Sequence, residues 1–485
     1  MMKRSLLLFA ILFIPLAAVA CDSSKGPQTD TDGDDGLIVF PKSPAPSHLV
    51  VYDARAHSLD MQYLLVSLQG VVNRDDPRIY LRTSPYGPGD TADHEDFWLE
   101  EMAGHFGITH EFAASPEDLM DRFGGEITGI IVTDPDMPHT LNPAAMLAAQ
   151  KDGIVAAPEL LDWLTAWDLP VHDDLRGVWE TNEDLYRWAF DNLWPGCTRE
   201  MLAYSWPGTP MSLDYWIAKK VFIIGLNLHI ADERALLEEI YAATPQNIPV
   251  FGWVVDELLG VILLSQYGKF LDASDHSPNL SVRSGLAPLP LPALAEPPAV
   301  ELENRIYLAF GYTDGDNISY INRNMLNQWQ DPDRGSIPLG WELNVAIHDL
   351  APEQLNYYYR TATPNDCFIG PPCGIGYMYP NLYPEDRMDE FLHISDVYYK
   401  RCGYRSAWLI NDDLTFSDEL ACRYQEAMDL DGIFFDYWDN MDKGWYAASC
   451  GIPVARSQYI YLIGPDQIPW ILDDARLAKT WLYPD

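Results

Sequence analysis

Three short apolar segments in the second half of the chain are each followed within three residues by a carboxylate. Asp314 and Asp316 follow residues 305–311, Asp412 follows residues 406–410, and Asp436 follows residues 432–435. A protonated carboxyl can give a proton to a leaving group, while an ionised one acts as base or nucleophile. We therefore take Asp314, Asp316 and Asp436 as candidate catalytic acids and bases, and Asp412 as a candidate ligand-binding residue.

The same residues also fit structural roles. Asp314-Gly315-Asp316 suits a tight turn, or a calcium site built from the same oxygens. Asp436 and Asp412 suit N-caps of the helices that follow. Asn317, next to the first pair, carries an amide that can bind a hydroxyl group.

A loop rich in glycine, proline and tyrosine lies between two of these segments. Within it, Gly374-Ile-Gly-Tyr-Met-Tyr-Pro380 excludes a helix or a central strand, because proline lacks a backbone N–H. Tyr377 and Tyr379 alternate with Met378, so an extended backbone directs both rings to one side. We expect them, with Trp341 and Trp438, to contact a ligand; the alternative is that they pack inward and fix the loop.

The elements that must position these residues follow an α/β pattern. In the first half, short apolar strands (residues 49–52, 78–82, 129–133, 153–157, 219–225 and 248–255) alternate with amphipathic helices (57–73, 142–150, 231–242 and 256–264). In the second half we expect strands at 305–311, 341–347, 367–370, 406–410 and 432–435, and a helix at 384–401. Carboxylates at strand ends are typical of β/α barrels. The pattern predicts an N-terminal α/β domain and a C-terminal β/α, TIM-barrel-like domain.

The N-terminus resembles an export signal. Lys3 and Arg4 precede an apolar run that ends in Ala18-Val-Ala-Cys21, which is similar to a bacterial lipobox. We therefore expect a signal peptide over 1–20, lipidation of Cys21 and an acidic tether over 21–46. The alternative is ordinary cleavage that leaves Cys21 free. A proline-rich linker at 286–299 separates the predicted domains, 47–285 and 300–485.

Several segments together resemble one protein family. Gly374 to Pro380 matches the pattern GxGYxYP, which names a family regarded as bacterial glycoside hydrolases. Residues 67–74, 250–253, 314–317 and 337–341 are similar to the same family. The resemblance extends from about His48 to the C-terminus, and it implies an N-terminal domain followed by a barrel-related domain. The family pattern leads us to expect a small polar residue where Cys373 stands, and a disulfide to Cys367 would explain the difference.

Composition restricts the partners. The chain has 485 residues, 31 basic and 72 acidic, for a formal charge of −41. Such a charge repels nucleic acid and anionic lipid, so we expect no nucleic-acid partner and membrane contact only through the anchor. Outside the cytoplasm an even number of further cysteines indicates disulfides, whose pairing stays open: Cys197, Cys367, Cys373, Cys402, Cys422 and Cys450. No P-loop or GxSxG motif is present.

The leading hypothesis is a cell-envelope glycoside hydrolase that acts on a poly- or oligosaccharide through paired carboxylates, without a cofactor. The alternative is a non-catalytic glycan-binding lipoprotein, in which a calcium ion bound at Asp314 and Asp316 assists.

Overall fold

The computed structural model describes the backbone of residues 9–13 and residues 36–83, 94–208, 212–274, 277–295, 307–435 and 445–456. The chain forms two compact units. The N-terminal unit comprises Ile38–Leu289 together with Ala346–Tyr357, and the C-terminal unit comprises Met1–Leu37, Pro290–Val345 and Tyr358–Asp485. The main division therefore falls inside the proline-rich segment. Within the described ranges, no helix combines the length and the apolar composition that spanning a bilayer requires.

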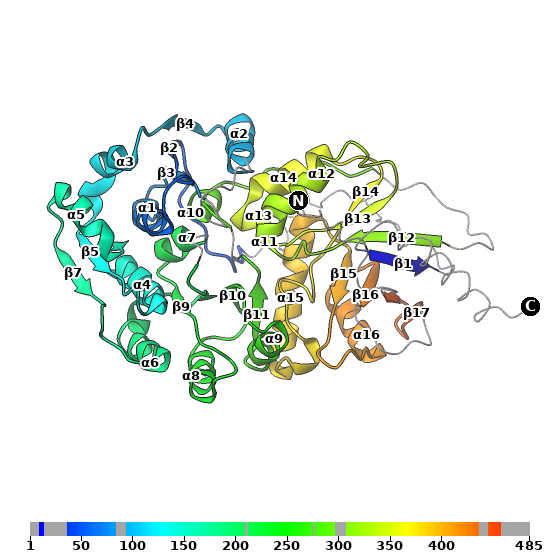
Figure 1. The fold of residues 1–485 in the computed structure, drawn as a ribbon. Coiled ribbons are helices and arrows are strands. Elements are labelled where there is room, and N and C mark those ends of the chain that lie inside the picture. Colours follow the sequence, from blue (N-terminus) through cyan, green and yellow to red (C-terminus); the bar gives the residue numbers. More distant parts are fainter. Residues whose placement is uncertain are drawn as a thin grey trace, which may run out of the picture. The chain divides into compact units, whose positions relative to one another are not determined.

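The N-terminal unit contains three parallel sheets, shown in blue to green in Figure 1. Their strand orders are β3-β2-β4, β6-β5-β7 and β11-β10-β8-β9. The strands are β2 (His48–Asp53), β3 (Ile79–Arg82), β4 (Thr109–Phe112), β5 (Gly129–Val132), β6 (Gly153–Ala156), β7 (Val171–Asp174), β8 (Leu202–Tyr204), β9 (Phe222–Ile224), β10 (Ile248–Gly252) and β11 (Lys269–Asp272). Their helices are α1 (Leu59–Val72), α2 (His94–Phe106), α3 (Pro116–Phe123), α4 (Leu141–Lys151), α5 (Leu161–Leu164), α6 (Asn182–Asn192), α7 (Leu213–Ala218), α8 (Ala231–Ala242), α9 (Glu257–Gln266) and α10 (Leu280–Arg283).

Helix α1 packs against α7 and β6 in the N-terminal unit. A Cβ on Gly70 would lie 2.7 Å from the carbonyl oxygen of Asp214, so only glycine allows this close approach. The Ser67 hydroxyl accepts a hydrogen bond from the backbone N–H of Val155, and Asn73 donates to the carbonyl of Ile79. The family-like segment 67–74 therefore joins separate sheets and has a structural role.

A buried ion pair holds residues 346–357 in the N-terminal unit. Arg283 donates from Nε to Glu353 at 2.5 Å, and the two side chains are 2% and 0% exposed. Helix α13 (Ile347–Leu350) and the first part of α14 (Pro352–Thr361) lie in this segment. Because two charges buried together compensate each other's desolvation, neither can be removed alone without a large cost.

The C-terminal unit contains two sheets, β1-β12-β13-β14 and β15-β16-β18-β17, shown mainly in yellow to red in Figure 1. The strands are β1 (Phe9–Phe13), β12 (Tyr307–Tyr312), β13 (Leu339–Glu342), β14 (Asp366–Ile369), β15 (Ser406–Leu409), β16 (Gly432–Phe435), β17 (Trp445–Ala447) and β18 (Pro453–Arg456). The helices here are α11 (Ile318–Tyr320), α12 (Leu326–Trp329), α15 (Glu385–Cys402) and α16 (Asp418–Ala427). Strand β1, inside the predicted signal peptide, pairs antiparallel with β12.

Most predicted elements are present with small shifts, and one strand is misplaced. Residues 341–347 were expected to form a strand, but β13 ends at Glu342 and α13 begins at Ile347. The apolar run 341–347 contains the end of β13 and the start of α13, and both are buried. Hydrophobicity alone does not show where one element ends and the next begins. Strands β4 and β7 are among the strands that were not predicted, because their polar sequences lie at sheet edges.

Candidate active site

The candidate site lies at the carboxyl ends of the parallel strands of the C-terminal unit. Strands β12, β13 and β14 run parallel in one sheet, and β15, β16 and β18 run parallel in the other. A parallel bridge between Pro372 and Trp408 connects the chain after β14 to β15. The segments that follow these strands therefore gather at one edge, which is where α/β proteins bind ligands.

The Asp314–Asn317 loop is held tightly against the end of β13. A Cβ on Gly315 would lie 1.7 Å from the carbonyl oxygen of Glu342, and the backbone N–H of Gly315 donates to Glu342 Oε2 at 3.3 Å. The Asn344 amide donates to the carbonyl of Asp316 at 2.5 Å. The Glu342 carboxylate thus reaches the backbone between the two predicted aspartates, which are both half-buried.

The backbone of this loop departs from ordinary conformations. Asp314 has a φ of 66°, in the left-handed region that non-glycine residues rarely adopt. After the loop, residues Ile321–Met325 form a π-helix between α11 and α12. Both features are frequent at functional sites, where the surrounding structure stabilises unusual geometry.

Asn317 has a structural role at the start of α11. Its side-chain oxygen accepts hydrogen bonds from the backbone N–H groups of Ser319, at 2.8 Å, and Tyr320, so it caps α11. The cap engages the carbonyl of the Asn317 side chain. Any contact with a ligand hydroxyl would therefore come from its NH₂ group.

Two carboxylates act on the same tyrosine. The pKa of the Tyr320 hydroxyl is raised to about 12, mainly by burial; the hydrogen bond with Tyr312 lowers this pKa, and the nearby charges of Asp314 and Glu342 raise it. Burial likewise raises the pKa of Tyr312. The two phenols therefore remain protonated at neutral pH and can donate hydrogen bonds beside the carboxylates.

Glu342 was not among the site residues predicted from the sequence. Period-two alternation along residues 339–342 allowed either face, whereas the structure buries Glu342 to 2% exposure beneath the loop. A single charged residue within the apolar run 339–347 was the signal that could have identified it.

The Gly374–Pro380 loop is anchored on β15 and α15. The backbone N–H of Cys373 donates to the carbonyl of Trp408 at 2.6 Å, and that of Ile375 donates to the Ser395 hydroxyl at 3.0 Å. Gly374 has a φ of 121°, and a Cβ there would lie 2.4 Å from the Ser395 hydroxyl. The glycines of the motif thus permit a turn that packs closely on α15.

The aromatic residues predicted to contact a ligand are almost fully buried in the protein interior. Tyr377 and Tyr379 are 5% and 4% exposed; their rings meet edge to face at 5.7 Å, and their hydroxyls lie 3.2 Å apart. Trp341 is 2% exposed, packs edge to face with Trp329 and donates to Asp366 at 2.8 Å. The tyrosines do lie on one side, and these rings form an aromatic core under the site.

Asp412 connects two of the loops. Its carboxylate accepts a hydrogen bond from the Asn381 side chain at 2.5 Å, immediately after the tyrosine motif, and Asn411 accepts one from the Asn381 backbone N–H. Three other predicted residues, Asp436, Trp438 and Cys21, lie outside the described residues.

The cysteine pairing suggested for the motif is wrong. Cys367 and Cys373 are not joined to each other by a disulfide, whereas Cys422 and Cys450 are. Cys367 lies on β14, and the chain then continues to the Pro372 bridge with β15. Cys373 therefore occupies a different, fully buried position, where its thiol faces the carbonyl of Ile410. Burial raises the pKa of the Cys373 thiol to about 12.

Metal binding was one alternative for the two aspartates. Among the residues that the structure describes, no group of three His, Cys, Asp or Glu side chains is arranged to hold a metal ion.

Comparison with protein families gives a consistent result. Three models match the N-terminal unit: the first GxGYxYP_N domain at residues 48–125, the second at 127–197, and the third GxGYxYP domain at 204–285. The model described as "GxGYxYP putative glycoside hydrolase C-terminal domain" matches residues 304–462. The chain belongs to the GxGYxYP family. The three N-terminal models correspond to the three parallel sheets, a division that the single predicted domain 47–285 did not contain.

A solved structure shares the GxGYxYP fold of this chain. It is the crystal structure of a "putative hydrolase" from Bacteroides thetaiotaomicron VPI-5482, with a TM-score of 0.74 and 20% sequence identity, and the match covers 85% of this chain and 80% of that one. The likeness establishes a mixed α/β fold with parallel sheets. No curated protein matches the chain.

Proposed function

We propose that this GxGYxYP protein hydrolyses glycosidic bonds in a poly- or oligosaccharide, and that the C-terminal unit carries the reaction. The observation that supports this most strongly is the Asp314-Gly315-Asp316 loop seated on Glu342 at the carboxyl edge of parallel strands. This loop supplies two half-buried aspartates next to a buried glutamate and two protonated tyrosines, and carboxylic groups are the residue chemistry that glycosidases use.

In this proposal Asp314 and Asp316 contact the substrate, because both are half-exposed. Asp436, directly after β16, is the third candidate for an acid or base. Glu342 is a positioning residue, since its buried carboxylate holds the backbone between the two aspartates. One carboxylic acid would protonate the glycosidic oxygen, and an ionised carboxylate would attack the anomeric carbon or activate water.

The finer architecture belongs to the same proposal. The parallel strands β12 to β14 continue through the Pro372 bridge into β15, β16 and β18, a succession that suits a TIM-barrel-like domain. Tyr377, Tyr379, Trp341, Trp438, Asn317 and Asp412 would then line the surroundings of the bound sugar. The first three are buried and would support the floor of the site, Trp438 would present its ring, and Asn317 and Asp412 would contribute polar groups.

The decisive experiment is a hydrolysis screen of the full-length protein against a panel of glycans, with Asp314→Asn, Asp316→Asn and Glu342→Gln as variants. We expect turnover by the wild type and a loss of turnover, with binding retained, in at least one aspartate variant. Saturable binding without turnover of any glycan would instead favour a glycan-binding protein.

We also propose export and lipid attachment at Cys21, on the basis of the N-terminal sequence pattern. The test is expression of the wild type and of Cys21→Ala, followed by detergent partitioning and mass spectrometry of the N-terminal peptide. A wild-type peptide without a lipid adduct would contradict the proposal.

A further inference from the structure

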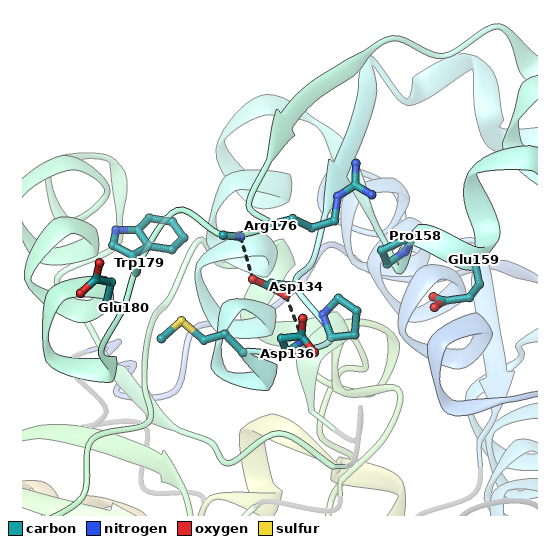
Figure 2. A pocket seen from close by; sticks show the side chains of 10 residues that line it. Asp134, Asp136, Pro158, Glu159, Arg176, Trp179 and Glu180 are labelled. Carbon is teal, nitrogen blue, oxygen red and sulfur yellow. Dashed lines mark hydrogen bonds between the residues drawn. The ribbon is translucent and has the colours of Figure 1, made fainter.

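A cavity of about 530 Å³ lies in the N-terminal unit, apart from the residues proposed for hydrolysis. Its walls come from the segments that follow β5, β6 and β7: residues 134–137, 158–159 and 176–180 (Figure 2). Strand β5 is central in this sheet, and the chain passes from it to β6 on one side and then to β7 on the other. Such a reversal of strand order, at the carboxyl edge, is where parallel sheets bind small molecules. The volume is also in the usual range for ligand pockets.

The cavity wall is fixed by one buried carboxylate. Asp134 is 8% exposed, and its two oxygens accept hydrogen bonds from the backbone N–H groups of Asp136, at 2.9 Å, and Gly177, at 2.8 Å. These bonds, drawn as dashed lines in Figure 2, join the loop after β5 to the loop after β7. The site is therefore preformed, which reduces the conformational entropy that a ligand must offset.

The charge of the lining excludes anionic ligands. It contains four carboxylates, from Asp134, Asp136, Glu159 and Glu180, and one guanidinium, from Arg176. Arg176 already pairs with Asp174, with Nε 2.8 Å from Oδ1. Glu159 and Glu180 lie at opposite sides of the cavity in Figure 2, and the described residues contain no group of three such side chains arranged for a metal ion.

An aromatic ring supplies the complementary surface. Trp179 lines the cavity and is half-buried, and its ring is supported by Trp188 of α6, with ring centroids 5.0 Å apart. Pro158 and Met137 add apolar surface to the same lining. A flat ring next to separated hydrogen-bond acceptors suits a pyranose, which presents a C–H face and several donating hydroxyls.

We propose that this cavity is a second carbohydrate site, which binds a neutral oligosaccharide with one sugar ring on Trp179 and its hydroxyls on Asp136, Glu159 and Glu180. An organic cation is the competing ligand, because it also binds aromatic faces. The sugar is favoured because the carboxylates of Asp136, Glu159 and Glu180 are solvent-exposed, and exposed ion pairs contribute little free energy. The proposal does not depend on hydrolysis by the C-terminal unit.

The test measures binding of a panel of neutral oligosaccharides to the full-length protein by calorimetry. The Asp316→Asn background is used so that turnover does not remove the glycan. We expect Trp179→Ala to weaken binding at this site about tenfold, equivalent to about 1.4 kcal/mol. Trp179→Phe should retain most of the affinity. Trp163→Ala, which removes a tryptophan outside the cavity, should leave binding unchanged.

Asp136→Asn and Glu180→Gln provide an independent test if Trp179→Ala is poorly folded by circular dichroism. Each should weaken the same binding event. The proposal is overturned if no neutral oligosaccharide binds, if the affinity is unchanged in all of these cavity variants, or if spermidine competes with the sugar for the site. Turnover assayed in the Asp316 wild-type background reports on the C-terminal unit separately, so failure of one proposal can be distinguished from failure of the other.

Discussion

Gly315→Ala is the sharpest perturbation of the candidate active site. The added methyl carbon would lie 1.7 Å from the carbonyl oxygen of Glu342 and 2.3 Å from its carbon, both backbone atoms that cannot rotate away. To reach the 3.0 Å that real Cβ contacts rarely undercut, the loop must move by at least about 1.3 Å. This movement also breaks the 3.3 Å hydrogen bond from Gly315 to Glu342.

Two magnitudes follow from this displacement. Overpacking of this kind costs about 1–3 kcal/mol of folding free energy. A misplacement of about 1 Å at a catalytic group lowers turnover about 10²-fold. We therefore expect Gly315→Ala to lower the thermal unfolding midpoint, by roughly 2–4 °C for each kcal/mol lost, and to reduce hydrolysis by about two orders of magnitude.

The assay pairs thermal unfolding with initial rates on the best glycan of the screen. Gly104→Ala is the matched control, because Gly104 lies within α2 and a Cβ there meets nothing within 4 Å. This control should be neutral or slightly stabilising, since alanine favours helix. If Gly315→Ala unfolds at the wild-type temperature and keeps its rate, the close packing of the loop on Glu342 is not a feature of the folded protein.

Three further predictions concern stability. Glu353→Gln leaves the Arg283 charge buried and should cost about 3–5 kcal/mol in chemical denaturation, whereas Arg283→Met combined with Glu353→Leu should recover much of this loss. Burial raises the pKa of Asp214 to about 6, so this carboxyl binds a proton more tightly in the folded protein than in the unfolded chain. The free energy of unfolding should therefore fall as the pH rises from about 4 to 6, by up to about 3 kcal/mol. Asp214→Asn should flatten this pH dependence, and an unchanged pH profile in the variant would contradict the assignment. Cys422→Ser opens the 28-residue loop closed by Cys450 and should destabilise by about 3 kcal/mol, which unfolding of the wild type with and without reductant checks independently.

The sequence by itself determined the features that depend on neighbouring residues. Apolar strands and amphipathic helices arise from local periodicity, so α1, β5 and α8 were predicted within two residues of their bounds. The Gly374–Pro380 loop was predicted because proline restricts φ and lacks a backbone N–H, while glycine permits conformations that other residues avoid. Its family pattern also identified the GxGYxYP family, which the family models confirm.

Tertiary structure decided every feature that depends on contacts between distant segments. The face of Glu342 was undetermined until the loop after β12 packed over the end of β13. The disulfide joins Cys422 to Cys450, and Cys373 stays free, because strand pairing sets which sulfurs can meet. The hydrogen bonds of Asp134 likewise bring loops 43 residues apart into one cavity wall. Alternation along one strand cannot encode such contacts, because burial and pairing are settled only when separate elements pack together.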